Sequence, residues 1–155
     1  TLAKIDLFDS YLAFCRDENS EITDSIIKIQ DRLIHLKGEI ATSPEKWENY
    51  RKKNNAISPV DVDYLDKCGE RIKTILEERG YKITGWVLYG DEGEFSSKFD
   101  YARALCREAE IAILELENKY FENTKTNEFK MNSEVKKYFN RLSDYLYWLA
   151  RFFSV

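Results

Sequence analysis

The chain has 155 residues, the length of one domain built around a single core, and we treat residues 1–155 as one domain. Its 24 basic and 28 acidic side chains are interspersed and give a formal net charge of −4, which argues against the basic patch that nucleic-acid binding requires. No apolar run reaches the length of a membrane span, and no signal-peptide pattern opens the sequence. We therefore expect a cytoplasmic protein with neither nucleic acid nor membrane as a partner. The three cysteines are widely spaced and predict reduced, buried thiols.

Hydrophobic periodicity predicts helices through the first half of the chain. Apolar residues recur at helical spacing over residues 2–16 and again from residue 22 to residue 40, in a helix that Ser20 can cap. After Ser43-Pro44, residues 47–55 predict a short helix within a polar connector.

The second half predicts further helices. Ser58 and Asp61 have the spacing of a capping box, and Gly80 supplies the stop of the helix that follows. Residues 81–94 contain three glycines and predict the one long loop.

The chain then continues as helix, turn and helix. Ser96 or Ser97 is expected to cap a helix that runs to about residue 121. Residues 123–132 predict a polar hairpin, and Asn132 or Ser133 is expected to cap the last helix. Five helical runs without an alternating strand pattern predict an all-α bundle with short connections.

Two predicted helices carry ordered polar stripes. On the last one, Asn140, Asp144, Tyr147 and Arg151 recur at steps of four, three and four beside an apolar seam. The seam consists of Phe139, Leu142, Leu146, Leu149 and Phe153. Short Asn and Asp side chains have poor propensity in the middle of a helix, so their presence there indicates a site.

The second stripe, on the preceding helix, consists of Asp100, Arg103, Arg107 and Glu110. Its spacing alone also fits an ordinary solvent-exposed ladder of salt bridges. The surrounding motifs decide between these interpretations.

The stretches A-R-A-L-C-R-E-A-E at 102–110 and N-R-L-S-D-Y-L at 140–146 resemble the two signature motifs of the PduO-type ATP:cob(I)alamin adenosyltransferases. In that family the motifs run A-R-T-x-C-R-R-A-E-R and L-N-R-L-S-D-x-L-F-x-L-A-R. Weaker similarities follow in order: residues 5–10 resemble D-E-L-N-S, residues 29–41 resemble I-Q…G-x-E-L-A, and residues 88–91 stand where the family has L-P-G-G. The resemblance covers nearly the whole chain.

The resemblance implies a five-helix bundle of the ferritin-like or adenosyltransferase type that assembles as a homotrimer with active sites between subunits. It implies a transferase that moves the 5′-deoxyadenosyl group of ATP to cob(I)alamin and releases triphosphate. The implied small-molecule partners are ATP, Mg²⁺ and a corrinoid, and no metal ligand is assigned to the chain itself. A ferritin-like di-iron site is excluded, because it needs two Glu-x-x-His motifs and the chain has one histidine, His35.

By matched position, the resemblance assigns roles to individual residues. Arg103 and Arg107 are the expected catalytic cations, and Asp6 matches an acid that pairs with the Arg103 position across the subunit boundary. The residues expected to bind nucleotide and corrinoid are Glu110, Asn140, Asp144 and Tyr147. Tyr147 stands where the family places a corrinoid-facing Phe. The alternatives are that Asn140 and Asp144 only cap or crosslink helices and that Tyr147 belongs to the core.

The sequence departs from the family pattern on the nucleotide side. Glu108 and Ile111 replace two arginines, and Asp100 stands in place of a His. An acid about 4 Å from a phosphate is repelled by about 4 kcal/mol at an effective dielectric of about 20, so Glu108 near the triphosphate would oppose binding. The family's T-R-T-G-D-x-G-x-T phosphate stretch has no counterpart within this sequence. A non-catalytic paralogue that keeps the trimer and corrinoid binding is therefore the alternative function.

Overall fold

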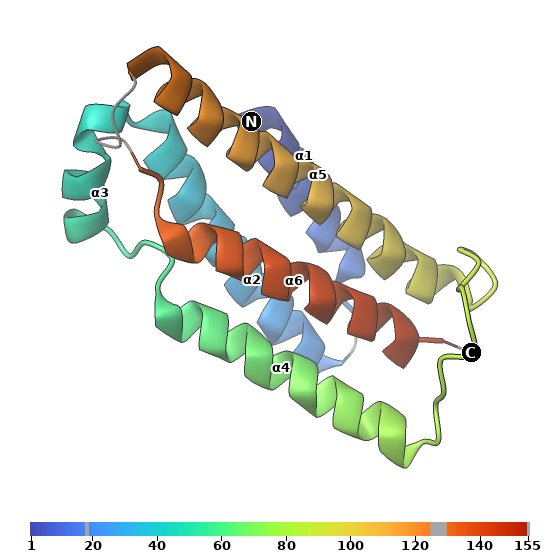
Figure 1. The fold of residues 1–155 in the computed structure, drawn as a ribbon. Helices are drawn as coiled ribbons and strands as arrows, with labels where there is room; N and C mark the ends of the chain where they lie inside the picture. Colours follow the sequence, from blue (N-terminus) through green and yellow to red (C-terminus); the bar gives the residue numbers. More distant parts are fainter. Residues whose placement is uncertain (18, 125–129, 155) are drawn as a thin grey trace.

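A computed structural model describes residues 1–17, 19–124 and 130–154, and within these ranges the regular structure is entirely helical (Figure 1). The α-helices are α1 (Leu2–Leu12), α2 (Ser20–Ala41), α3 (Trp47–Lys53), α4 (Pro59–Glu78), α5 (Glu94–Thr124) and α6 (Ser133–Phe152). Two short 3₁₀ turns, η1 (Ala13–Cys15) and η2 (Pro44–Lys46), follow α1 and precede α3. The all-α prediction is confirmed, with five long helices and the short α3.

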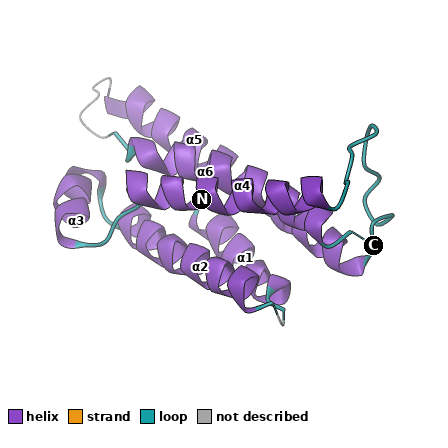
Figure 2. Ribbon diagram, turned by 90° about the horizontal axis from the view of Figure 1, so that it is seen from below, coloured by secondary structure: helices purple, strands orange, loops and turns teal. Residues whose placement is uncertain are grey.

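The five long helices form a bundle in which α6 packs against both α5 and α4, while α1 packs against α5 and α2. The short α3 stands at one end of the bundle (Figure 2). The end of α6 and the loop between α4 and α5 lie together at the other end (Figure 1). The polar stripes of α5 and α6 therefore belong to neighbouring helices.

The core follows directly from the apolar spacing of the sequence. On α6, Phe139, Leu142, Leu146 and Leu149 are completely buried, as the seam predicted. They belong to one cluster with residues from every long helix, such as Phe8, Ile29, Leu65 and Ala109. Burying each large apolar side chain contributes roughly 1.5–3 kcal/mol, so this seam fixes which side of α6 faces inward.

Local signals set several helix ends as predicted. Ser58 N–H donates to Asp61 Oδ2 over 2.9 Å in the capping box that opens α4. At the end of α4, Gly80 has a φ of 71°, and the N–H groups of Gly80 and Tyr81 donate to the carbonyls of Glu77 and Leu76. This is a Schellman motif, which requires a left-handed residue that glycine adopts without strain.

Other boundaries differ from the prediction. The first helix stops at Leu12 and tightens into η1, instead of continuing to residue 16 as an α-helix. Asn19, and not Ser20, caps α2, since its Oδ1 accepts a hydrogen bond from Ile22 N–H over 3.1 Å. On α6 the structure decides between the two predicted caps and confirms Asn132, because Asn132 Oδ1 accepts a hydrogen bond from Glu134 N–H while Ser133 is already helical.

The limits of α5 also differ. The helix begins at Glu94, two residues before Ser96, so both predicted caps lie inside the helix, and Ser97 Oγ donates back to the carbonyl of Gly93. It continues to Thr124, so Asn123 is helical and is not part of a hairpin. The rest of the predicted hairpin lies largely in residues 125–129, outside the described residues.

The structure also tests the expectations that the cysteines are buried thiols and that no segment spans a membrane. Cys15, Cys68 and Cys106 carry free thiols, of which Cys15 and Cys106 are buried as expected while Cys68 is half-exposed. In the described part of the chain, no helix is both long enough and apolar enough to cross a bilayer.

Candidate active site

Ion pairs fix the register between the antiparallel helices α5 and α6. Arg151 Nη2 lies 2.6 Å from Asp100 Oδ2 at one end, and Lys136 Nζ of α6 contacts Glu117 Oε2 of α5 at the other. The polar stripes of α5 and α6 lie between these two ion pairs, on neighbouring helices. We call the six predicted residues on these stripes the α5/α6 face: Arg103, Arg107, Glu110, Asn140, Asp144 and Tyr147.

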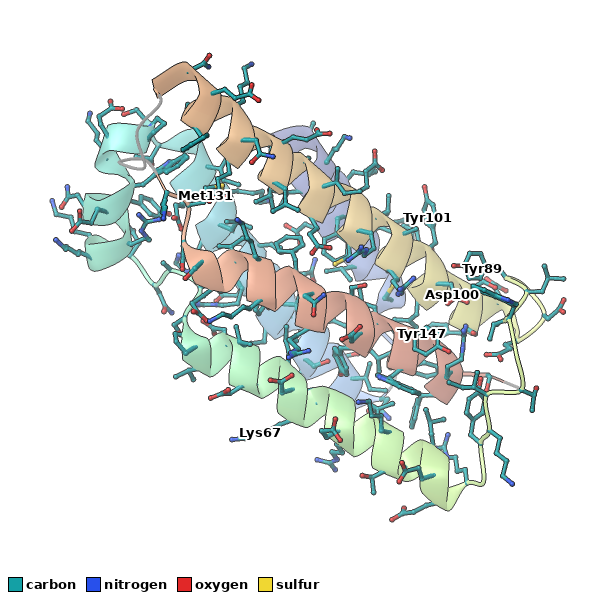
Figure 3. The ribbon with its side chains drawn as sticks, in the orientation of Figure 1. Lys67, Tyr89, Asp100, Tyr101, Met131 and Tyr147 are labelled. Carbon is teal, nitrogen blue, oxygen red and sulfur yellow. The ribbon has the colours of Figure 1, made fainter. Side chains whose placement is uncertain are left out.

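Arg103 and Tyr147 are brought together on this face. The guanidinium carbon of Arg103 lies 5.8 Å from the centroid of the Tyr147 ring, and both residues are half-buried. Arg103 Nε is buried and has no hydrogen-bond partner within the described structure. Tyr147 therefore lies between the helices, with Asp100 nearby on α5 (Figure 3). The contact joins a cation and an aromatic ring, the two groups expected at the meeting point of nucleotide and corrinoid.

Arg107 and Glu110 form a pair one turn further along α5. Arg107 Nη1 donates to Glu110 Oε2 over 2.7 Å, with 47% of the Arg107 side chain and 14% of the Glu110 side chain exposed. The pair is the i, i+3 contact expected from the spacing, and it holds the guanidinium at the surface. Arg107 is thus available to an anion from solvent.

Asn140 and Asp144 are exposed on the outer side of α6. The nearest cation to Asp144 is Arg141, whose Nη1 lies 3.9 Å from Asp144 Oδ2 and whose Nε contacts Asp66 of α4 at 2.9 Å. Neither Asn140 nor Asp144 caps a helix or belongs to the core. Asp144 therefore lies at the α4 edge of the α5/α6 face, and within the described residues it forms no ion pair with Arg103 or Arg107.

Asp6 lies elsewhere in the same chain. Its Oδ1 accepts a hydrogen bond from Lys37 Nζ of α2 over 2.8 Å, and Lys37 also contacts Asp9 at 2.9 Å. Lys4, on the other flank of α1, contacts Glu108 of α5 at 3.3 Å. Asp6 therefore faces α2, and a single chain does not bring it to Arg103.

The surface has hollows whose positions can be compared with those of the predicted site residues. One of about 600 Å³ beside Asp6 lies between α1 and α2, and one of about 220 Å³ beside Asp144 lies between α4 and α6. A third, of about 530 Å³, lies mainly between α2 and α4 and contains none of the predicted site residues. Neither Arg103 nor Arg107 lines any of the three. Cavity volume in one chain thus does not identify the site.

The prediction assigned no role to a buried charge cluster at the end of the α5/α6 face. Arg151 is 1% exposed and reaches Asp100, while its Nε lies 2.7 Å from Glu92 Oε2. Tyr81 Oη donates to the other oxygen of Glu92 over 3.1 Å, so the cluster also ties together the two ends of the loop. Burial raises the pKa of Asp100, and the charges of Arg151 and Arg103 oppose that rise. Asp100 and Arg151 stand on the two predicted stripes, but only the register of the helices reveals that they meet.

Two of the departures from the family pattern, Glu108 and Ile111, lie on the surface of α5. Glu108 stands five residues from Arg103, about 140° around an ideal helix, and its carboxylate contacts Lys4 of α1. Ile111 is exposed. Glu108 therefore lies on a different side of α5 from Arg103 and has a cation, Lys4, beside its carboxylate.

The arrangement can bind an anion through Arg103 and Arg107 and an apolar ring through Tyr147. In the described part of the chain, no group of three or more His, Cys, Asp or Glu residues has the arrangement of a metal site.

The sequence of the chain is similar to that of a known protein over most of its length. The chain is 28% identical over 151 residues to the corrinoid adenosyltransferase PduO of Salmonella typhimurium strain LT2, which covers 95% of this chain. The chain spans 39% of the length of that relative. The cobalamin adenosyltransferase family model matches residues 1–153. Since this match extends over nearly the whole sequence and includes both polar stripes, the chain belongs to the cobalamin adenosyltransferase family.

Proposed function

We propose that this protein is a corrinoid adenosyltransferase, which transfers the 5′-deoxyadenosyl group of ATP to cob(I)alamin and releases triphosphate. Family membership supports this activity, and the observation that carries it is the contact between Arg103 and the Tyr147 ring. The contact supplies a cation and an aromatic surface at one place, and the reaction needs both.

The chemistry explains why two arginines are useful. The cobalt of cob(I)alamin donates its electron pair to C5′ of ATP and forms a cobalt–carbon bond. The bond between C5′ and the bridging oxygen breaks, and triphosphate leaves with the electron pair of that broken bond. Negative charge thus builds on the leaving group. We expect Arg103 and Arg107 to stabilise it with charge-assisted hydrogen bonds, since Arg107 is exposed and the buried Nε of Arg103 has no hydrogen-bond partner among the described residues.

The remaining residues of the face have proposed roles in orientation. Tyr147 presents an aromatic surface against which a corrin face can pack and exclude water. Asn140 and Asp144 are exposed and offer hydrogen bonds to hydroxyl or amide groups of the two substrates. Their short side chains in the middle of α6 are explained by this role.

We expect Mg²⁺ to bind at this face together with the triphosphate, whose oxygens would be among its ligands. Mg²⁺ in nucleotide sites is held by phosphate oxygens, waters and one or two carboxylates. Glu110 is the carboxylate beside Arg107 and is 14% exposed, so it is the residue we expect to contact the ion or its waters. The ion would supply neutralising charge to the triphosphate.

We further propose that the site is completed by a neighbouring copy in a homotrimer. Within one chain Asp6 is paired with Lys37 on the α1/α2 side, whereas Arg103 contacts Tyr147 on the α5/α6 face. A second copy that presents its α1/α2 side to this face would bring Asp6 to Arg103. The cytoplasmic location expected from the sequence stays a prediction.

The direct test is formation of adenosylcobalamin from ATP and chemically reduced cobalamin, followed by absorbance. We expect turnover with the wild-type protein and at least about tenfold slower turnover with Arg103→Met, because one charge-assisted contact to the leaving group is lost. Absence of wild-type turnover, with reduction of the corrinoid verified, would refute the activity.

The second candidate is a non-catalytic paralogue that keeps corrinoid binding. The observation that favours it is the replacement of two family arginines by Glu108 and Ile111. Titration calorimetry separates the candidates: binding of cobalamin without binding of ATP supports the paralogue, and binding of both supports the enzyme.

A further inference from the structure

Arg151 is buried at the end of the α5/α6 face, where it is enclosed by carboxylates. It is 1% exposed and contacts two carboxylates, Asp100 at 2.6 Å and Glu92 at 2.7 Å. Its guanidinium carbon also lies 5.1 Å from the centroid of the Tyr147 ring. Asp100 has a 6% exposed side chain, so its charge depends on a protein cation for compensation.

Arg103 is the other cation near Asp100. The two residues stand three positions apart on α5, the spacing at which an acid and a base readily pair on a helix. The charge of Arg103 already acts on the carboxyl of Asp100, since it lowers the pKa that burial raises. Even so, within the described residues Arg103 forms no ion pair, its Nε is unpartnered, and its guanidinium lies over Tyr147. Asp100 is occupied by Arg151 instead.

We propose that Arg151 is a positioning residue that satisfies Asp100 and thereby leaves Arg103 free to bind the triphosphate, an inference that rests on the nucleotide-binding role proposed for Arg103. Arg151 itself is enclosed and does not reach a substrate. Without it, Asp100 would be a buried, uncompensated carboxylate, and the guanidinium of Arg103 would turn from Tyr147 to pair with it. Such a pair would withdraw the cation from the α5/α6 face.

Two double variants with the same net charge test this competition. Arg151→Met with Glu92→Gln removes one cation and one acid and leaves Asp100 with Arg103 as its nearest cation. Arg151→Met with Asp100→Asn removes the same charges but leaves no acid to capture Arg103. Each variant removes one of the two carboxylates that form ion pairs with Arg151, so each avoids leaving both of them uncompensated.

We expect the Arg151→Met/Glu92→Gln variant to bind ATP at least about tenfold more weakly than wild type, and the Arg151→Met/Asp100→Asn variant to stay within about threefold. Crystal structures of the two variants provide a readout that is independent of nucleotide. The Arg103 guanidinium should contact Asp100 in the first and remain over Tyr147 in the second. Denaturant unfolding of both variants shows whether a change in ATP affinity follows a change in stability.

The outcomes separate this inference from the proposed function. If Arg103 keeps its position over Tyr147 in the Arg151→Met/Glu92→Gln variant, or if both variants lose ATP affinity equally, the positioning role is wrong. If the wild-type protein binds no ATP, the proposed function fails, and the position of Arg103 in the two crystal structures still decides whether Arg151 controls it. If the Arg151→Met/Glu92→Gln variant does not fold while the Arg151→Met/Asp100→Asn variant does, Arg103 does not compensate Asp100, and the inference is overturned.

Discussion

Replacement of Arg107 by Met tests the predicted binding of triphosphate at the α5/α6 face. In the free protein Arg107 contacts Glu110 at 2.7 Å and its side chain is 47% exposed, so it can turn toward a ligand at little cost. A charge-assisted hydrogen bond to a phosphate oxygen is worth about 1.5–3 kcal/mol. Releasing an i, i+3 ion pair costs about 0.2–0.5 kcal/mol. The net contribution of Arg107 is therefore about 1–2.8 kcal/mol, which corresponds to roughly a 5- to 110-fold weaker Kd for ATP in Arg107→Met.

Titration calorimetry with ATP measures this change, and Arg71→Met is the matched control. Arg71 is also exposed and also paired with a glutamate, Glu21, but it lies on α4 away from Arg103. It removes the same charge, so it reports the effect of net charge alone, which we expect to be less than about twofold because of salt screening. Equal weakening by the two substitutions would refute a specific contact between Arg107 and the triphosphate. An unchanged Kd in Arg107→Met would do the same.

Three further outcomes follow from the structure. Tyr147→Ala should weaken cobalamin binding by roughly tenfold through loss of its aromatic surface, while Tyr147→Phe stays close to wild type; equal affinities in a spectroscopic titration would contradict the corrinoid-facing role. Glu108→Gln should change the Kd for ATP less than about twofold, since Glu108 points to Lys4, and a large gain in affinity would mean that its charge does reach the nucleotide. Burial raises the pKa of all three thiols, to about 12 for Cys15, but Cys15 and Cys106 are buried whereas Cys68 is partly exposed, so a thiol-specific reagent at about pH 8 should modify Cys68 first in the folded protein. Cys68→Ser should remove this early reaction, and modification of several thiols before unfolding would show that the core opens.

The sequence by itself determined the elements of the bundle and the identity of the family. Apolar residues at helical spacing must be buried together, so the seam of Leu142, Leu146 and Leu149 specified the inward side of α6 without any knowledge of its neighbours. The capping box at Ser58 and the stop at Gly80 are equally local, since each depends on backbone groups a few residues away. The ends of α1 and α5 were harder to predict, because helices there compete with 3₁₀ turns and with serine side chains that bond back to the backbone.

The tertiary structure decided which of the polar residues act on one another. Residues distant in the chain meet only through the register of α5 and α6, and so the pairing of Asp100 with Arg151 and the contact of Arg103 with Tyr147 could not be read from spacing along one helix. The same holds for Glu108, whose effect depends on the helix that lies opposite it. Electrostatic energy depends on distance and burial in space, whereas helical periodicity reports only the face of each helix on which a residue stands.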